Sequence, residues 1–316
     1  MTLHRVTNGN GQSVKRGLPT ISISVENFES LIRFIKKYYK VISVSEYLQY
    51  VRNEIGLSEN CLILSFDDGY KEVLDNALPL LKKHGLPAVL FIPVAAIEQG
   101  SCFWWDALYA GLSENHNGSF ELQGSDDPAF RPYVSRMKKI AATKLPKKAQ
   151  AIYDFIEALQ NSSANIRGRV VDHIRALFRN SNNHNPQLPG VLNWQEVKQF
   201  GDSGVEIGSH TVNHQFLSTV SVEEADKELQ GSKARLENFL KREVACFSYP
   251  GGKYNEEIAQ RVEKAGYACA FTSDRGINAT KGNLYKLKRL NISDDNVANS
   301  RGRFSSAITA WYLFLR

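Results

Sequence analysis

The chain has 316 residues, of which 42% are hydrophobic and 23% are charged, and its formal net charge is +6. This is the composition of an ordinary globular protein with enough apolar residues for a sizeable core. No apolar run approaches the roughly 18–20 residues of a membrane-spanning helix, which argues against an integral membrane protein. The first residues, MTLHRVTNGNGQ, lack the apolar stretch of a secretory signal. We therefore expect a cytoplasmic protein that is at most peripheral at the inner membrane.

The positive charge is concentrated in one part of the chain. Residues 131–179 contain eleven Lys or Arg and only three Asp or Glu. Solvated helix faces are the simplest interpretation, and the alternative is attraction to a membrane surface, a phosphorylated lipid carrier or an acidic glycan. No nucleic-acid-binding module accompanies this charge, so nucleic acid is not an expected partner. The four cysteines are widely spaced without a CxxC pair, which favours free thiols over disulfides or structural zinc.

Helix and strand patterns alternate along most of the chain. Apolar periodicity of 3.6 residues predicts a helix over 25–40, with Ser24 as its N-cap, and another over 71–85 that ends at Gly85. Further helices are expected over 222–240 and 255–266. Short apolar runs predict strands over 40–44, 61–66, 87–94, 206–209, 244–250 and 267–273. This alternation favours an α/β protein built as a deformed or incomplete (β/α) barrel.

Residues 100–190 differ from the rest of the chain. They begin with FWWDAL, pass through a Gly/Ser/Asp/Asn-rich stretch near 113–128 and contain the basic segment. We interpret the chain as one domain over 1–316 with a largely helical insertion over 100–190 on the barrel rim. The insertion is a candidate lid.

The sequence LSFDDGY, residues 64–70, places two carboxylates at the end of a predicted buried strand. An Asp-Gly turn is the simple explanation for an isolated motif of this kind. In a barrel, however, functional side chains lie at the carboxyl ends of the strands. Asp67 and Asp68 are therefore candidates for a site.

A second motif supplies partners for these carboxylates. HTVNH follows the strand-like EIG and places His210 and His214 four residues apart, so on a helical turn both rings would face one side. Two His and one carboxylate with an open position form a hydrolytic zinc arrangement. One of the two aspartates can therefore bind the metal, while its neighbour acts as general base on the metal-bound water.

At this point the sequence resembles the polysaccharide deacetylases, carbohydrate esterase family four. SFDDG at 65–69 is similar to the first motif of that family, and HTVNH at 210–214 to the second. The resemblance implies a deformed (β/α) barrel that removes N-acetyl or O-acetyl groups from glycans with a divalent metal, usually zinc. It also implies that Asp67 is the catalytic base and that Asp68, His210 and His214 bind the metal.

FSYPGG at 247–252 resembles the third motif, which lines the substrate groove, so Tyr249, Pro250 and Gly251 are candidate substrate-binding residues. The family usually has an Arg in this motif where the chain has Ser248. Its fourth motif usually has an Asp and a Trp, whereas FTSDRG offers Asp274 alone. A His near the C-terminus that acts as general acid is missing.

A subgroup that acts on poly-N-acetylglucosamine looks circularly permuted, with the acid His on an N-terminal strand. The chain begins LHRVTNG, so by this resemblance His4 is the candidate general acid. An exposed, functionless His is the alternative. Arg289, in LKRLNI, is the candidate replacement for the missing Arg beside Asp67.

Other features leave alternatives open. Trp105 in FWWD could stack on sugar rings or anchor the insertion. The apolar segment ITAWYLFLR could close the barrel or contact a membrane interface. The basic insertion could also contact a membrane. The expected substrate is an acetylated glycan or a lipid-linked sugar. Two other functions are a deformylase of a lipid-linked aminosugar and a carbohydrate-binding pseudoenzyme.

Overall fold

The computed structural model describes residues 1–8, 17–53, 60–100, 102–114, 127–143, 147–180, 189–279 and 282–314. The chain divides into two compact units. The first comprises Met1–Gly9, Thr20–Ser101 and Gly190–Arg316, and the second comprises Asn10–Pro19 and Cys102–Pro189.

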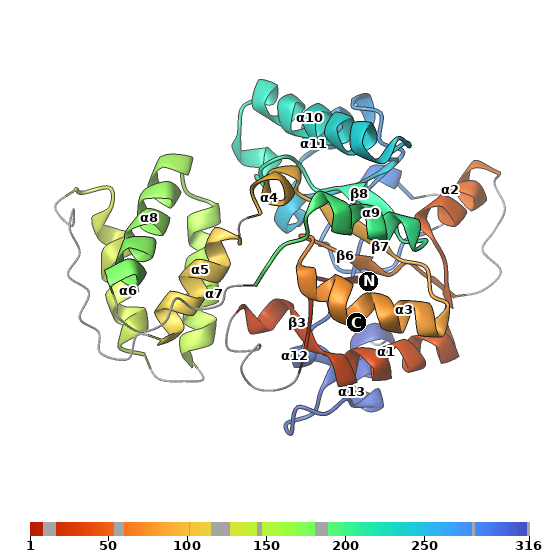
Figure 1. Ribbon diagram of the computed structural model, residues 1–316, viewed down its shortest axis with the longest axis horizontal. Coiled ribbons are helices and arrows are strands. Elements are labelled where there is room, and N and C mark those ends of the chain that lie inside the picture. Colours follow the sequence, from red (N-terminus) through yellow and green to blue (C-terminus); the bar gives the residue numbers. More distant parts are fainter. Residues whose placement is uncertain are drawn as a thin grey trace. The chain divides into compact units, whose positions relative to one another are not determined.

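The first unit is built on a parallel sheet of six strands in the order β1-β6-β7-β8-β9-β10. Three of these strands, β6, β7 and β8, are labelled beside one another in Figure 1. Two further parallel pairs, β2-β3 and β4-β5, lie outside this sheet. The strands are β1 (Thr2–Leu3), β2 (Arg5–Thr7), β3 (Ser22–Ser24), β4 (Lys40–Val41), β5 (Cys61–Leu62), β6 (Ser65–Phe66), β7 (Val89–Ile92), β8 (Glu206–Ser209), β9 (Cys246–Ser248) and β10 (Cys269–Phe271). Because every pair is parallel, the carboxyl ends of the six main strands lie at one edge.

The segment 287–292 connects the two outer strands of this sheet. The Leu287 N–H donates to the Ala270 carbonyl (2.9 Å) and the Thr272 N–H donates to the Leu287 carbonyl (2.8 Å), which pairs the segment with β10. The Thr2 N–H donates to the Leu290 carbonyl (2.8 Å) and the Ile292 N–H to the Thr2 carbonyl (2.9 Å), which pairs it with β1. The curled sheet is thereby a deformed, incomplete (β/α) barrel, which confirms the predicted fold class.

The expected strand 61–66 is divided between two pairings. Cys61 and Leu62 pair with β4, whereas Ser65 and Phe66 pair with β1 and β7. The prediction of one continuous buried strand was wrong. The half-buried Cys61 belongs to the outer pair, and only β6 enters the core sheet.

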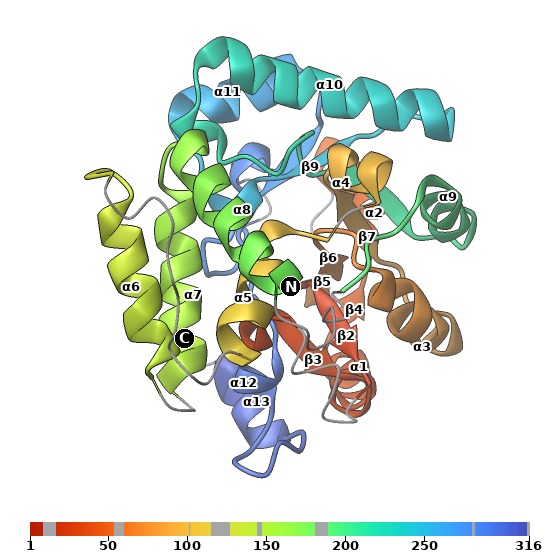
Figure 2. The same cartoon turned by 60° about the vertical axis from the view of Figure 1, so that its left-hand side comes forward.

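Helices cover the strands of the first unit, and in Figure 2 α1, α3, α9 and α10 follow one another in an arc around them. Their bounds are α1 (Val25–Tyr38), α2 (Val44–Arg52), α3 (Leu78–His84), α4 (Val94–Gln99), α9 (Trp194–Asp202), α10 (Val222–Leu240), α11 (Glu256–Lys264), α12 (Asp294–Val297) and α13 (Ser306–Phe314). Short helical turns are η2 (Pro19–Ile21), η4 (Leu217–Thr219), η5 (Pro250–Gly252) and η6 (Leu284–Lys286), and α3 is preceded by the π-helical turn η3 (Val73–Ala77).

Local signals explain several helix ends. The Ser24 side chain accepts a hydrogen bond from the Asn27 N–H, as expected for the N-cap of α1. Gly85 ends α3 in the left-handed conformation, with φ of 63°. Phe28 of α1 packs edge-on against Phe66 of β6, with ring centroids 5.9 Å apart, and both side chains are fully buried. Burial of each such side chain contributes about 1.5–3 kcal/mol.

The described part of the second unit is mainly helical, with α5 (Trp104–Glu114), α6 (Arg131–Ala141), α7 (Lys147–Gln160) and α8 (Ala164–Asn180). Met137, Ile152, Phe155 and Leu159 form part of its core. Within the predicted insertion, residues 101, 115–126, 144–146 and 181–188 lie outside the described residues. The function of the insertion as a lid stays a prediction.

Two further expectations concern the whole chain. The four cysteines are free thiols, and Cys246 and Cys269 are buried on neighbouring strands. Among the described residues, no helix combines the length and apolar character needed to cross a bilayer.

Candidate active site

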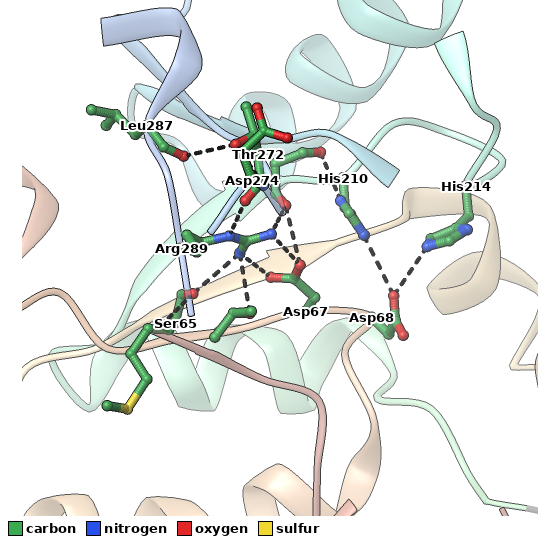
Figure 3. Close-up of polar contacts among 12 residues, drawn as sticks. Ser65, Asp67, Asp68, His210, His214, Thr272, Asp274, Leu287 and Arg289 are labelled. Carbon is green, nitrogen blue, oxygen red and sulfur yellow. Dashed lines mark hydrogen bonds and ion pairs between the residues drawn. The ribbon is translucent and has the colours of Figure 1, made fainter. Parts of the chain in front are cut away.

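The two adjacent aspartates lie at the carboxyl end of β6, and the backbone turns sharply between them. The Asp67 N–H still donates to the Leu3 carbonyl of β1 (2.9 Å). Asp68 and Gly69 then both adopt the left-handed conformation, with φ of 74° and 72°. Asp is among the few residues that tolerate this region. The turn separates the two side chains, so that Asp67 faces Arg289 and Asp68 faces His210 and His214 (Figure 3).

Arg289 binds Asp67 with both ends of its guanidinium group. Nη1 donates to Asp67 Oδ1 and Nη2 donates to Asp67 Oδ2, each at 2.8 Å. Nη2 also donates to Ser248 Oγ (2.9 Å), and this hydroxyl donates to Asp67 Oδ2 (3.2 Å). Nε donates to the Thr272 carbonyl (2.8 Å). The predicted neighbour of Asp67 is therefore in contact with it, in the two-pronged geometry that gives strong charge-assisted hydrogen bonds.

The surroundings of Asp67 keep its carboxyl group ionised. Burial on its own would raise the pKa of Asp67, which is only 3% exposed. The charges of Arg289 and His210 and the hydrogen bonds from Arg289 outweigh burial and lower the pKa to about 2. Asp67 is thus an oriented carboxylate at neutral pH, as a general base must be.

Asp68 forms a cluster with the two histidines. Its Oδ1 lies 3.2 Å from His214 Nε2 and 3.5 Å from His210 Nε2. One ligand atom from each of the three residues lies within 4.8 Å of the others. Burial would raise the pKa of Asp68, but the contacts with His210 and His214 and the charges of His214 and His4 hold it well below its usual value.

The loop that carries the two histidines is not a helical turn, so the predicted helical geometry was wrong. His210 directly follows β8. The residues after it are not helical, because Thr211 and His214 have positive φ values of 67° and 54°. The rings nevertheless meet, with centroids 4.8 Å apart. Left-handed non-glycine residues cost free energy and are typical of functional sites.

The donor set fits a divalent cation. His210 Nδ1 lies 2.7 Å from the Ser248 carbonyl, so it carries the hydrogen and donates it. In the neutral ring this leaves a lone pair on Nε2, which faces the Asp68 carboxylate. Two acceptors that face each other are satisfied by a cation between them. Two imidazoles and a carboxylate are the protein ligands of many hydrolytic zinc sites.

His4 lies next to both carboxylates. It follows β1 as Asp67 follows β6, and these strands pair in register at Leu3 and Phe66. Burial lowers the pKa of His4 below the ordinary value of 6.5, while the charges of Asp68 and Asp67 raise it. His4 is thus a partly buried side chain at the end of the strand beside Asp67, and its function as general acid stays a prediction.

The segment predicted to line the substrate groove is only partly available. Tyr249 is fully buried, and its hydroxyl donates to the Tyr285 carbonyl (3.0 Å). Its N–H donates to the Phe271 carbonyl (3.0 Å), and Pro250 has no N–H. Gly251 is exposed, so among these three residues it is the one left to offer a backbone amide.

Trp105 belongs to the second unit. Its ring stacks on Phe103, with centroids 4.4 Å apart, and is 4% exposed. Sugar stacking by this residue stays a prediction.

Glu228 is a buried carboxyl group beside the site that was not among the residues predicted from the sequence. Glu228 lies on α10 and accepts hydrogen bonds from the loop between His210 and His214. Its position on the buried stripe of α10, beside Ala225 and Leu229, was a usable signal. A carboxylate on the apolar face of a helix needs a partner.

The sequence of the chain matches known proteins over this same region. The family model described as polysaccharide deacetylase matches residues 55–119 and 165–270, which include both aspartates and both histidines. The chain belongs to the polysaccharide deacetylase family.

Individual relatives agree with this assignment. YxkH of Bacillus subtilis, whose name assigns it provisionally to the polysaccharide deacetylases, is 20% identical over 302 residues, which are 95% of this chain and 73% of that protein. The poly-beta-1,6-N-acetyl-D-glucosamine N-deacetylase of Staphylococcus aureus is 31% identical over 81 residues, covering 25% of this chain and 28% of that protein. A de-N-acetylase from Aggregatibacter actinomycetemcomitans has the same fold, with a TM-score of 0.62, 16% identity and coverage of 99% and 98% of the two chains.

Proposed function

We propose that this chain is a divalent-metal-dependent hydrolase that removes N-acetyl or O-acetyl groups from a glycan or a lipid-linked sugar. The observation that carries the proposal is the divergence of two adjacent aspartates. Asp67 is bound by Arg289, whereas Asp68 faces two imidazoles. One carboxylate thus suits proton transfer and the other suits metal binding. A relative named as a poly-beta-1,6-N-acetyl-D-glucosamine N-deacetylase makes N-acetylated glycans the first substrates to test.

Asp68, His210 and His214 would hold the ion, and we expect zinc. A divalent ion bound there supplies Lewis acidity, which polarises an acyl oxygen and makes water more acidic. The side chains of the protein then have separate tasks, which follow from their contacts.

Asp67 accepts the proton of the attacking water. Arg289 and Ser248 hold its carboxylate in one orientation, so little reorganisation accompanies the proton transfer. In this proposal the exposed amide of Gly251 donates to the oxygen that develops negative charge. His4 gives a proton to the departing nitrogen as the C–N bond breaks.

The proposal is tested by product analysis. Metal-loaded protein is incubated with N-acetylglucosamine oligomers, and acetate and free amine are measured beside Asp67→Asn as the control. Release of both products by the wild type alone supports the proposal. Formate released from a formylated aminosugar, without acetate from any glycan, would favour the deformylase. Binding of oligomers without either product would favour a carbohydrate-binding pseudoenzyme.

A location at the cytoplasmic side of the inner membrane is a further proposal. Trp311 and Phe314 on α13 are 45% and 46% exposed, and Arg301 and Arg303 are exposed just before this helix. Aromatic and basic side chains together suit the interface of an anionic bilayer. Co-sedimentation with phosphatidylglycerol vesicles, lost in Trp311→Ala, would support it. Equal recovery of both proteins in the supernatant would contradict it.

A further inference from the structure

The loop that carries the two histidines has an unfavourable backbone. Thr211 and His214 both have positive φ, and the residues between them lie in neither a helix nor a strand. Such a conformation persists only when the surrounding structure holds it in place. The buried polar groups around this loop therefore decide where the His214 ring lies.

Glu228 holds the amide side of the loop. Its Oε2 accepts hydrogen bonds from the N–H groups of Val212 and Asn213, both at 2.8 Å. Its Oε1 accepts a third bond from Asn213 Nδ2, at 2.6 Å. The Glu228 side chain is 4% exposed, and the bond from Val212 is buried, whereas the two bonds from Asn213 are partly buried. Hydrogen bonds to a carboxylate are strongest where water is excluded.

The carbonyl side of the same loop is held by α4. The N–H groups of Val94 and Ala95, in the first turn of this helix, donate to the carbonyls of Thr211 (3.2 Å) and Val212 (2.9 Å). The N–H groups of the loop therefore donate to Glu228, and its carbonyl groups accept from α4. Glu228 is the one carboxyl side chain among these partners.

Helix α10 is itself fixed to β8, the strand that directly precedes His210. Ser232 Oγ lies 2.7 Å from Ser209 Oγ, which belongs to the last residue of β8. At Gly231 the helix comes so near the loop that an added Cβ would lie 3.3 Å from Val212 Cγ2. Glu228 therefore acts from a rigid support close to both histidines.

We propose that Glu228 is a positioning residue for the metal-ligating loop. It holds Val212 and Asn213 so that His214 points at Asp68. The inference rests on the proposed function, because it assigns a purpose to the geometry of the His210–His214 pair. Removal of a residue that orients a metal ligand without touching the metal typically weakens metal binding about 10–100-fold.

The test measures metal binding without any substrate. Purified full-length wild type, Glu228→Ala and Glu228→Gln are titrated with Co²⁺, and affinity and the visible absorption spectrum of bound Co²⁺ are recorded. Glu224→Ala, an exposed position one turn earlier on α10, is the matched control. We expect about 10–100-fold weaker binding and an altered spectrum for Glu228→Ala, with no change for the control. Glu228→Gln should restore much of the affinity, because its oxygen can still accept from the two backbone amides.

A second pair of variants covers the case in which Glu228→Ala does not fold. Asn213 is exposed, so Asn213→Asp should fold, yet it places a negative charge against Glu228. We expect weaker Co²⁺ binding in Asn213→Asp. Binding should recover when Glu228→Gln is added, because the new amide can donate to the new carboxylate.

Three outcomes would overturn the inference. Wild-type affinity and spectrum in folded Glu228→Ala would overturn the inference and leave the proposed function intact. Wild-type binding by Asn213→Asp would do the same. Absence of Co²⁺ and Zn²⁺ binding by the wild type would instead overturn the proposed function, and the inference with it.

Discussion

The two halves of the site differ in how their carboxylates are neutralised. Asp67 meets a fixed cation from the chain itself, because Arg289 binds both of its oxygens. Asp68 meets the Nε2 atoms of two imidazoles, which lie 3.5 Å and 3.2 Å from its Oδ1. The first half is complete within the protein, whereas in our proposal the second half binds a metal ion. The difference arises from one backbone turn at Asp68 and Gly69.

The variant Asp67→Asn tests most severely whether the two halves of the site have separate tasks. This change removes the proposed base and leaves the three proposed metal ligands in place. We expect turnover to fall about 10²–10⁴-fold, the usual contribution of a general base. Metal content should stay at the wild-type level. Loss of the metal together with activity would show that the two halves are not separate.

Removal of the fixed cation should affect both folding and the pH profile. Arg289→Ala leaves a buried carboxylate without its partner, which typically costs about 3–5 kcal/mol of stability. In the wild type the lowered pKa of Asp67 stabilises the fold fully above about pH 4, and this contribution is lost as the pH falls through about 2.

Arg289→Ala removes the charge and the hydrogen bonds that Arg289 contributes to lowering the pKa of Asp67, so this pKa should rise from its wild-type value. The acid limb of kcat/KM should then move to higher pH. Thermal unfolding and activity are measured across pH, with Lys288→Ala, an exposed neighbour, as the control. An acid limb at the wild-type pH would argue against control of Asp67 by Arg289.

His4 is the proposed proton donor for the leaving group. His4→Gln should lower turnover of N-acetyl substrates about 10²-fold. Because burial lowers its pKa below 6.5, the acid function predicts an alkaline limb that begins near or below neutral pH and is absent in the variant. Hydrolysis of 4-nitrophenyl acetate, whose leaving group needs no proton, should change little. Equal losses on both substrates would contradict the acid function.

Ser248 should give the smallest effect. Its hydroxyl accepts from Arg289 and donates to Asp67, so Ser248→Ala removes one of several contacts to the carboxylate. We expect kcat to fall about tenfold or less, with KM and metal content unchanged. A loss as large as that of Asp67→Asn would mean that Arg289 alone does not hold the base.

Much of this architecture follows from local sequence patterns. The helix at 222–240 has the predicted bounds, and the strand at 206–209 is as expected, because amphipathic period and apolar runs act locally. The division of 61–66 between two pairings depends on distant strands, which no local pattern encodes. The left-handed residues of the HTVNH loop depend on Glu228 and α4, and so the helical turn was the wrong expectation.

The site shows the same limit. Asp67, Asp68 and the two histidines could be predicted because their motifs are contiguous in the sequence. Arg289 could be proposed only because Ser248 stands where the family usually has an Arg. Its contact with Asp67 depends on the segment 287–292, which joins β10 to β1. Glu228 was missed because its partner is the backbone of another element.

The most direct test of the central claim is the metal content of the purified protein by elemental analysis. Wild type and Asp67→Asn are compared with Asp68→Ala and His210→Ala after incubation with zinc. We predict about one ion per chain in the first two proteins and loss of the ion in the other two. No ion in the wild type, or equal loss in Asp67→Asn, would contradict the assignment of the two aspartates to different tasks.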